Sequence, residues 1–209
     1  MRKRHAVILF MGIFFLAGCM SQKQPTSKYY VIETPDTLKL SPSPGQLPME
    51  GYCEIAPVDV YPAYATQSIA QRKGSHEIVY YSYHHWAVRP GESMTLLLED
   101  YLSRASLFDG VSTRFWKIQP AYKLKTTVFQ LEALRENEAM VAHLSLRFAL
   151  VSTRDNESLV VHQANRKQSL PRKDLNLYAQ TVSELFHEEL GRFSKKMVEQ
   201  LADNPDEGQ

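Results

Sequence analysis

The chain is poor in cysteine and carries almost no surplus of charge of either sign. Its two cysteines, Cys19 and Cys53, cannot build a disulfide scaffold and cannot close a four-cysteine zinc site. The 24 basic and 23 acidic residues give a formal net charge of +1. Because a nucleic-acid-binding protein needs a surplus of lysine and arginine to neutralise phosphates, this balance excludes a broadly basic protein with a nucleic-acid partner.

Common catalytic signatures are missing as well. The sequence contains no G-x-S-x-G elbow, no G-x-x-x-x-G-K-S/T phosphate loop, no G-x-G-x-x-G and no H-E-x-x-H. His143 and His162 fall on neighbouring predicted strands and could face each other; the alternative is that both are solvated or hydrogen-bonded. The acidic pair Glu188 and Glu189 is expected on a solvated helix face. We therefore predict no catalytic residue, no metal site and no bound cofactor, and hence a protein that is not an enzyme.

The N-terminus has the features of a lipoprotein leader. Three basic residues at positions 2–4 precede an apolar run at residues 6–16. As a helix this run spans about 16 Å, too short for a hydrocarbon core of about 30 Å, so it fits a cleaved signal peptide. The run ends in Leu-Ala-Gly-Cys at residues 16–19, which resembles the lipobox of bacterial lipoproteins. The alternative is an ordinary signal peptide with an incidental cysteine.

We therefore predict a signal peptide at residues 1–18 and a lipidated N-terminus and tether at residues 19–28. Cys19 would carry a covalent N-acyl diacylglycerol, with an acyl chain such as palmitate, and each buried CH₂ contributes about 0.8 kcal/mol to membrane binding. Met20 and Ser21 follow Cys19, whereas an aspartate there favours inner-membrane retention in enteric-type bacteria. We expect the periplasmic face of the outer membrane, with the inner membrane less favoured.

The rest of the chain predicts one domain at residues 29–203, followed by a polar tail at 204–209. Prolines between residues 35 and 48 mark a loop, Pro90 opens a helix that Asp109 ends, and Asp174 or Asn176 caps a long final helix. Cys53 is expected to be buried and unreactive. Strands are predicted at 29–32, 52–60, 68–71, 78–83, 121–131, 142–150 and 159–166. This order predicts a single two-layer α+β domain, with a mainly antiparallel sheet and two helices packed on one face.

Residues 80–86 are unusually rich in aromatic and imidazole side chains. On a regular strand Tyr81 and Tyr83 lie on one side, and Trp86 lies on the opposite side, which we expect to face the core. Tyr81 and Tyr83 are therefore candidate interface residues, because tyrosine buries a large area at low entropic cost. The alternative is a core strand with a decorated outer face.

Three segments resemble those of a known family. They are Tyr-Tyr-Val-Ile at 29–32, Ile-Ala-Pro-Val-Asp-Val-Tyr-Pro-Ala-Tyr at 55–64, and Tyr-His-His-Trp-Ala-Val-Arg-Pro at 83–90. Behind a lipobox, their order and spacing resemble the ABC-type transport auxiliary lipoprotein family, similar to the lipoprotein of the paraquat-inducible system. The resemblance covers about 29–200. It departs at 65–67, where Ala-Thr-Gln replaces a polar pair that the family often has.

The resemblance implies a non-catalytic, envelope-anchored subunit. Its partners would be an inner-membrane permease, a cytoplasmic ATPase and a periplasmic component of the mammalian-cell-entry type, and the system would move lipids or hydrophobic compounds between the two membranes. Some members of the family are expected to assemble as homo-oligomeric rings. The alternative is an outer-membrane assembly or structural lipoprotein that contacts peptidoglycan or a barrel protein.

Overall fold

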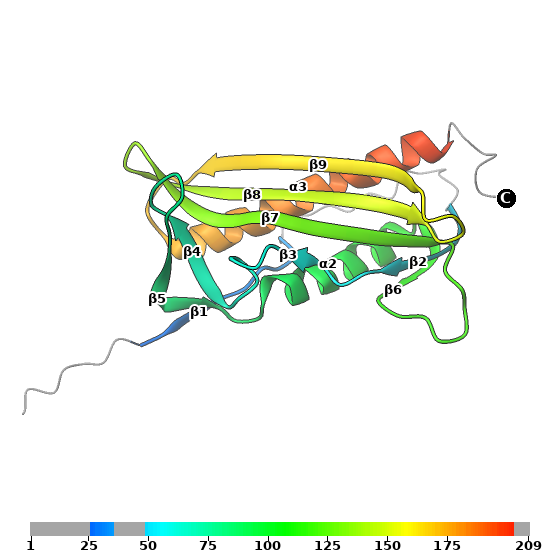
Figure 1. Cartoon of the computed structure of the whole chain (residues 1–209), viewed down its shortest axis with the longest axis horizontal. Helices are drawn as coiled ribbons and strands as arrows, with labels where there is room; N and C mark the ends of the chain where they lie inside the picture. Colours follow the sequence, from blue (N-terminus) through cyan, green and yellow to red (C-terminus); the bar gives the residue numbers. More distant parts are fainter. Residues whose placement is uncertain (1–25, 36–48, 203–209) are drawn as a thin grey trace, which may run out of the picture.

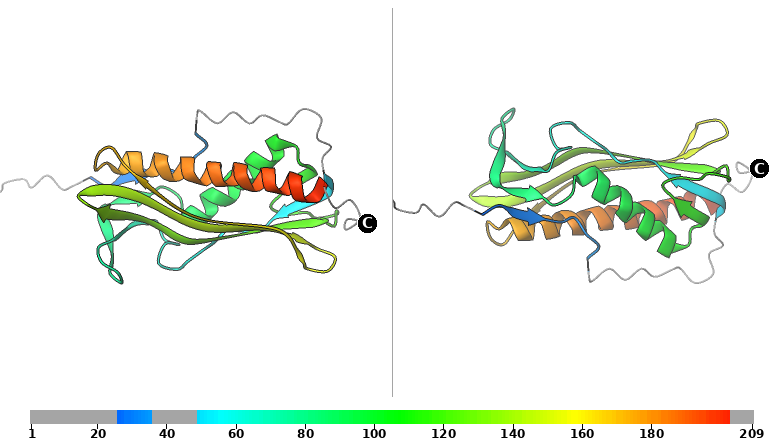
Figure 2. Two further views of the ribbon diagram at one scale, coloured as in Figure 1. Left: turned by 90° about the horizontal axis from the view of Figure 1, so that it is seen from above. Right: turned by 90° about the horizontal axis from the view of Figure 1, so that it is seen from below.

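The computed structural model describes residues 26–35 and 49–202. The predicted signal peptide, the predicted lipidation site Cys19, most of the tether, the proline-rich loop and the polar tail lie outside these residues. The described part is a two-layer α+β unit, with one open sheet and both helices on one of its faces (Figure 1, Figure 2). The predicted fold class is confirmed.

Three long strands form the antiparallel meander that the alternating pattern predicts. β7 spans Tyr122–Glu136, β8 spans Ala139–Ser152 and β9 spans Ser158–Ser169, and each pairs antiparallel with the next. Asn137 and Glu138 connect β7 to β8 with positive φ angles of 46° and 65°, which suit the twist of a tight hairpin. All three predicted strands are confirmed, and each is longer than its predicted range.

Six shorter strands extend the sheet from the other edge of β7. They are β1 (Lys28–Tyr30), β2 (Met49–Ile55), β3 (Asp59–Val60), β4 (Ser68–Arg72), β5 (Ile78–Trp86) and β6 (Phe108–Ser112). β2, β3 and β4 each pair parallel with a different part of β7. β6 lies parallel to β2, and β5 joins β4 to β1. The sheet is therefore mixed, since long connections bring short strands back in parallel.

α2 (Pro90–Ala105) begins at the predicted proline but ends before the predicted Asp109. Ser106 adopts a left-handed φ of 51°, which stops the helix. Phe108 is the first residue of β6 and is buried, at 5% exposure. It therefore packs into the core from a strand and not from the apolar face of the helix. The predicted helix end was wrong because an apolar residue at helical spacing suits either element.

α3 (Leu175–Ala202) begins where Asp174 caps its first turn. The Oδ1 atom of Asp174 accepts hydrogen bonds from the backbone N–H groups of Asn176 and Leu177, at 2.8 and 3.3 Å. The helix runs along β8 and β9 and reaches β1 (Figure 2). Of the two predicted caps, Asp174 is the one that the structure uses.

The core lies between the sheet and the helices and is rich in aromatic rings. Trp86, only 2% exposed, packs against Tyr178 of α3, and Phe148 of β8 stacks on Phe193 of α3. Cys53 is fully buried on β2, and burial raises the pKa of its thiol to about 12. The predicted burial of Trp86 and of Cys53 is confirmed.

Candidate functional site

A bulge in β5 shapes the end of the molecule at which the chain enters the domain. Tyr80 pairs with Ala70, and His85 pairs with Ser68. Between these two pairs β5 therefore contains more residues than β4. Surplus residues on one strand bend it and break the alternation of its side chains. β5 accordingly turns sharply before it leads into α2 (Figure 1).

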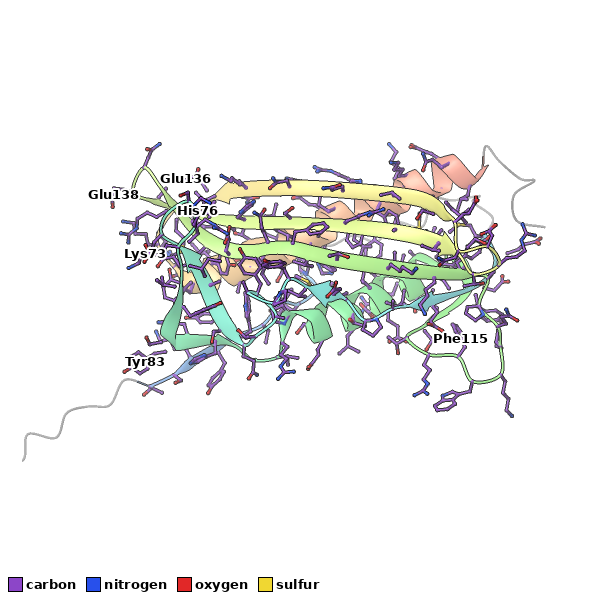
Figure 3. All side chains as sticks on the ribbon, viewed as in Figure 1. Lys73, His76, Tyr83, Phe115, Glu136 and Glu138 are labelled. Atoms are coloured by element: carbon purple, nitrogen blue, oxygen red, sulfur yellow. The ribbon has the colours of Figure 1, made fainter. Side chains whose placement is uncertain are left out.

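The bulge overturns the predicted arrangement of the two candidate tyrosines. The ring of Tyr81 contacts that of His84 at 5.9 Å, although strict alternation would place them on opposite sides. Tyr81 is half-buried and faces the helix layer, whereas Tyr83 is 48% exposed at the outer corner of the bend (Figure 3). The prediction that Tyr81 and Tyr83 share one side was therefore wrong, because it assumed a regular strand.

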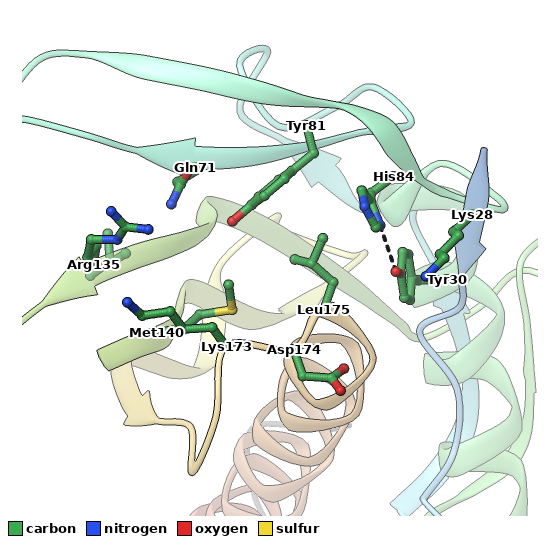
Figure 4. Close-up of a pocket in the computed structure, with 11 residues that line it drawn as sticks. Lys28, Tyr30, Gln71, Tyr81, His84, Arg135, Met140, Lys173, Asp174 and Leu175 are labelled. Atoms are coloured by element: carbon green, nitrogen blue, oxygen red, sulfur yellow. Dashed lines mark hydrogen bonds between the residues drawn. The ribbon is translucent and has the colours of Figure 1, made fainter. Parts of the chain in front are cut away.

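A pocket of about 450 Å³ opens beside Tyr81. It lies between β1, the β4–β5 hairpin, the joined ends of β7 and β8, and the start of α3 (Figure 4). We call it the β5 pocket. Its lining residues are Lys28, Tyr30, Gln71, Tyr81, His84, Leu134, Arg135, Met140, Lys173, Asp174 and Leu175.

One side of the β5 pocket is a tyrosine–imidazole pair. The Tyr30 hydroxyl lies 2.7 Å from Nδ1 of His84, and the two rings stack with centroids 5.7 Å apart. Burial lowers the pKa of His84, and the positive charges of Lys28 and His85 lower it further. The imidazole is therefore neutral at pH 7, so its Nδ1 can accept a hydrogen bond from the Tyr30 hydroxyl.

The rest of the lining is mainly basic. Lys28, Arg135 and Lys173 supply cationic groups, although the Lys173 ammonium is paired with Glu138 at 2.9 Å, and Asp174 is the one acidic residue among the lining residues. The Asp174 carboxylate is already engaged with the first turn of α3, whose backbone N–H groups lower its pKa. Burial raises the pKa of Tyr81, whose hydroxyl stays protonated and available as a donor. This arrangement suits an anionic or hydrogen-bond-accepting group.

The two candidate metal histidines do not meet. His162 pairs with Phe148 of β8, an odd number of positions from His143, so the two imidazoles point to opposite faces of the sheet. His143 lies 3.2 Å from Glu132 Oε1 on β7, and His162 lies 2.8 Å from Glu189 Oε2 on α3. The expectation that they could face each other was wrong, and the alternative of hydrogen-bonded histidines holds. Within residues 26–35 and 49–202, no group of three metal-ligating side chains comes together.

Both of these carboxylates are buried, which the sequence did not reveal. Glu132 is fully buried and accepts hydrogen bonds from the Tyr64 hydroxyl at 2.6 Å and from Arg72 Nε at 2.8 Å. Glu189, only 1% exposed, is bound by Arg166 in addition to His162. The expectation of a solvated face for Glu189 was wrong. Glu132 connects β4 and the β3–β4 turn to β7, and Glu189 connects α3 to β9. Both carboxylates therefore have a structural role.

The fold and the site define a small α+β domain whose notable cavity is a basic, aromatic-lined pocket beside the entering chain. The sequence model for the ABC-type transport auxiliary lipoprotein component matches residues 30–190, and the chain belongs to that family. The family makes the protein a lipoprotein of the bacterial envelope and an auxiliary transport component. No curated protein matches the sequence.

Two solved structures share the fold. Protein XCC0632 of Xanthomonas campestris is 13% identical, with a TM-score of 0.69, over 84% of this chain and 99% of the other. A second structure, of an uncharacterized protein, is 13% identical with a TM-score of 0.62, over 82% and 99%. Neither helix in the described ranges is long and apolar enough to cross a membrane.

Proposed function

We propose that the protein is a non-catalytic auxiliary subunit of an ABC system that includes a mammalian-cell-entry-type periplasmic component. It would act with an inner-membrane permease and a cytoplasmic ATPase, and the system would move lipids or other hydrophobic compounds between the two membranes. We place the protein at the periplasmic face of the outer membrane, held by the acyl chains on Cys19.

The extent of the family match carries this proposal. The match runs from Tyr30, the last residue of β1, well into α3, so it includes β2 to β9 and every lining residue of the β5 pocket except Lys28. Lys28, on the rim of the pocket, follows Cys19 by nine residues. An extended tether of that length spans about 30 Å, so the pocket stays within that reach of the lipid anchor.

We propose the outer corner of β5 as the contact for the periplasmic component or for a neighbouring copy in a ring. Tyr83 is 48% exposed there, and Tyr29 of the adjoining edge strand is 65% exposed. Tyrosine rings bury a large area with little loss of side-chain entropy, which is why they are enriched in interfaces. Tyr81, turned into the pocket, would support this corner from the inside.

Affinity purification from membranes of the native bacterium tests the proposal. The full-length protein, tagged at its C-terminus, should recover the permease, the ATPase and the mammalian-cell-entry-type component together. Recovery of a barrel protein or peptidoglycan fragments without any transporter subunit would favour the alternative, a structural lipoprotein of the outer membrane.

Variants locate the contact. Tyr83→Ala should reduce recovery of the partners and lower the sedimentation coefficient of any ring, because it removes an exposed ring without touching the core. The matched control is Tyr61→Ala, since Tyr61 is 59% exposed on the turn between β3 and β4. Tyr81→Phe, which keeps the ring, should leave the fold intact. Equal recovery with Tyr83→Ala and Tyr61→Ala would place the contact elsewhere.

A further inference from the structure

The loop between β6 and β7 carries exposed apolar and basic side chains that the proposed function does not use. Trp116 is 80% exposed, the highest exposure among the large hydrophobic side chains of the described residues, and Ile118 is 43% exposed. Arg114 and Lys117 lie beside them in the sequence and are exposed too. We call residues 113–118 the basic-aromatic loop.

The base of this loop is fixed, so its tip is held out from the body. The Phe115 ring packs edge-on against Tyr52 of β2, with centroids 5.5 Å apart. Figure 3 marks Phe115 on the loop. The backbone N–H of Thr113 donates to Glu99 of α2 at 3.2 Å. Beyond the loop, the carbonyl of Pro120 accepts a hydrogen bond from the Thr153 hydroxyl at 2.6 Å. The loop is therefore anchored at both ends, and only its tip is exposed.

The charged side chains of the loop itself are all basic, whereas the Glu99 carboxylate of α2 lies at its base. Between Asp109 and Glu132 the sequence has no acidic residue and four basic ones. Lys123 is paired with Glu54 at 2.7 Å, so its charge is partly offset. The Arg114 guanidinium stacks on the indole of Trp116, 4.0 Å from the ring centroid. An indole with a guanidinium against it suits the boundary between acyl chains and phosphate headgroups.

We propose that the basic-aromatic loop is a second membrane contact, which inserts Trp116 and Ile118 into the headgroup region of a bilayer containing anionic lipid. The family makes this a membrane-anchored protein, and the tether enters at β1. β1 and the loop both lie along the edge of the molecule opposite β9 (Figure 1). One acyl anchor and one insertion point would restrict how the domain rotates on the bilayer, and so which face it offers to partners. The inference rests on the membrane anchor and not on the transporter partnership.

Tryptophan fluorescence of the lipidated full-length protein in vesicles tests this inference. The chain has two tryptophans, and Trp86 is buried in the core, so the difference between wild type and Trp116→Phe reports Trp116 alone. In phosphatidylethanolamine vesicles with phosphatidylglycerol, the Trp116 emission should shift to shorter wavelength. It should be quenched by lipids brominated near the headgroup and protected from aqueous iodide.

The charge requirement is tested with a matched pair of double variants. Each basic residue near an anionic surface strengthens binding by about fivefold, so Arg114→Gln with Lys117→Gln should weaken the insertion equilibrium of the loop by about 25-fold. Lys73→Gln with Arg147→Gln removes the same charge from exposed residues on β8 and on the β4–β5 turn, and should leave insertion unchanged.

The outcomes separate the loop from the anchor. Vesicle flotation reports the anchor independently, so a protein that floats while Trp116 stays open to iodide overturns the loop contact alone. Protection of Trp116 that appears only when the transporter subunits are added would make the loop a protein contact, which also overturns the inference. A protein that fails to float overturns both the anchor and the loop.

Discussion

Replacing Glu132 by Gln should destabilise the protein and remove part of its acid sensitivity. The Glu132 side chain is fully buried, and its carboxylate accepts hydrogen bonds from Tyr64, Arg72 and His143. An amide offers one oxygen in place of two and carries no charge, so Arg72 loses the charge that compensates it. Disrupting a buried ion pair costs about 3–5 kcal/mol.

The pKa of Glu132 gives a second measure of the same effect. Burial by itself would raise this pKa, but hydrogen bonds from His143, Arg72 and Tyr64 lower it from 4.5 to about 2. At 1.36 kcal/mol per pKa unit, the ionised form is stabilised by about 3 kcal/mol in the folded state. Because the folded pKa is the lower one, this stability is complete above about pH 5 and is lost as the pH falls from 4.5 towards 2. About 2 kcal/mol of it is gone by pH 3.

Urea unfolding at pH 7 and pH 3 measures both quantities on the chain without residues 1–19. At pH 7, Glu132→Gln should lower the free energy of unfolding by about 3 kcal/mol. Between pH 7 and pH 3, the variant should lose about 2 kcal/mol less than wild type, because glutamine does not titrate. Glu136→Gln is the control, since its exposed pair with Lys167 should matter little. An equal loss on acidification in wild type and Glu132→Gln would refute the assignment.

Three further changes test the core, the cap and the anchor. Trp86→Ala should lower the free energy of unfolding by about 3–5 kcal/mol, measured by urea titration, because the ring packs against Tyr178. Asp174→Ala should cost about 0.5–2 kcal/mol in the same assay through the loss of the α3 cap, and Asn176→Ala much less. Cys19→Ser should abolish labelling by a fatty-acid probe in cells, since serine has no thiol for the diacylglyceryl group; undiminished labelling would contradict the predicted anchor.

The parts of the fold that follow from local pattern could be predicted. The alternation of apolar and polar residues along β8 and the turn residues at Asn137 and Glu138 define the meander without knowledge of distant contacts. The start of α2 at Pro90 and the cap of α3 at Asp174 follow from the needs of a helix N-terminus. These are interactions between residues close together in the sequence.

The parallel pairings could not be predicted, because they join segments far apart in the chain. β2 lies between β6 and β7, and nothing in its seven residues identifies those neighbours. β6 itself was missed, because Phe108 continues the helical spacing of α2 and the helix stops on the backbone conformation of Ser106. A left-handed residue other than glycine leaves little trace in a single sequence.

The candidate site was predicted only in part, because β5 is not a regular strand. The aromatic richness of residues 80–86 correctly marked a segment of interest, and Trp86 is in the core as expected. A period of two then placed Tyr81 and Tyr83 together, and the β5 bulge separates them. The position of a bulge depends on how β4 and β5 pair, so a pattern read from β5 alone does not contain it.

The buried carboxylates show the same limit for charged residues. Glu132 and Glu136 lie four positions apart on β7, yet the first is fully buried and the second is half exposed. What distinguishes them is the set of donors that meet Glu132, which come from the β3–β4 turn, from β4 and from β8. A carboxylate is buried only where such partners converge, because an unpaired buried charge is costly. In this fold the convergence arises from parallel pairing of β4 with β7, so the non-local topology places the charge, and Glu132 in turn holds that topology together.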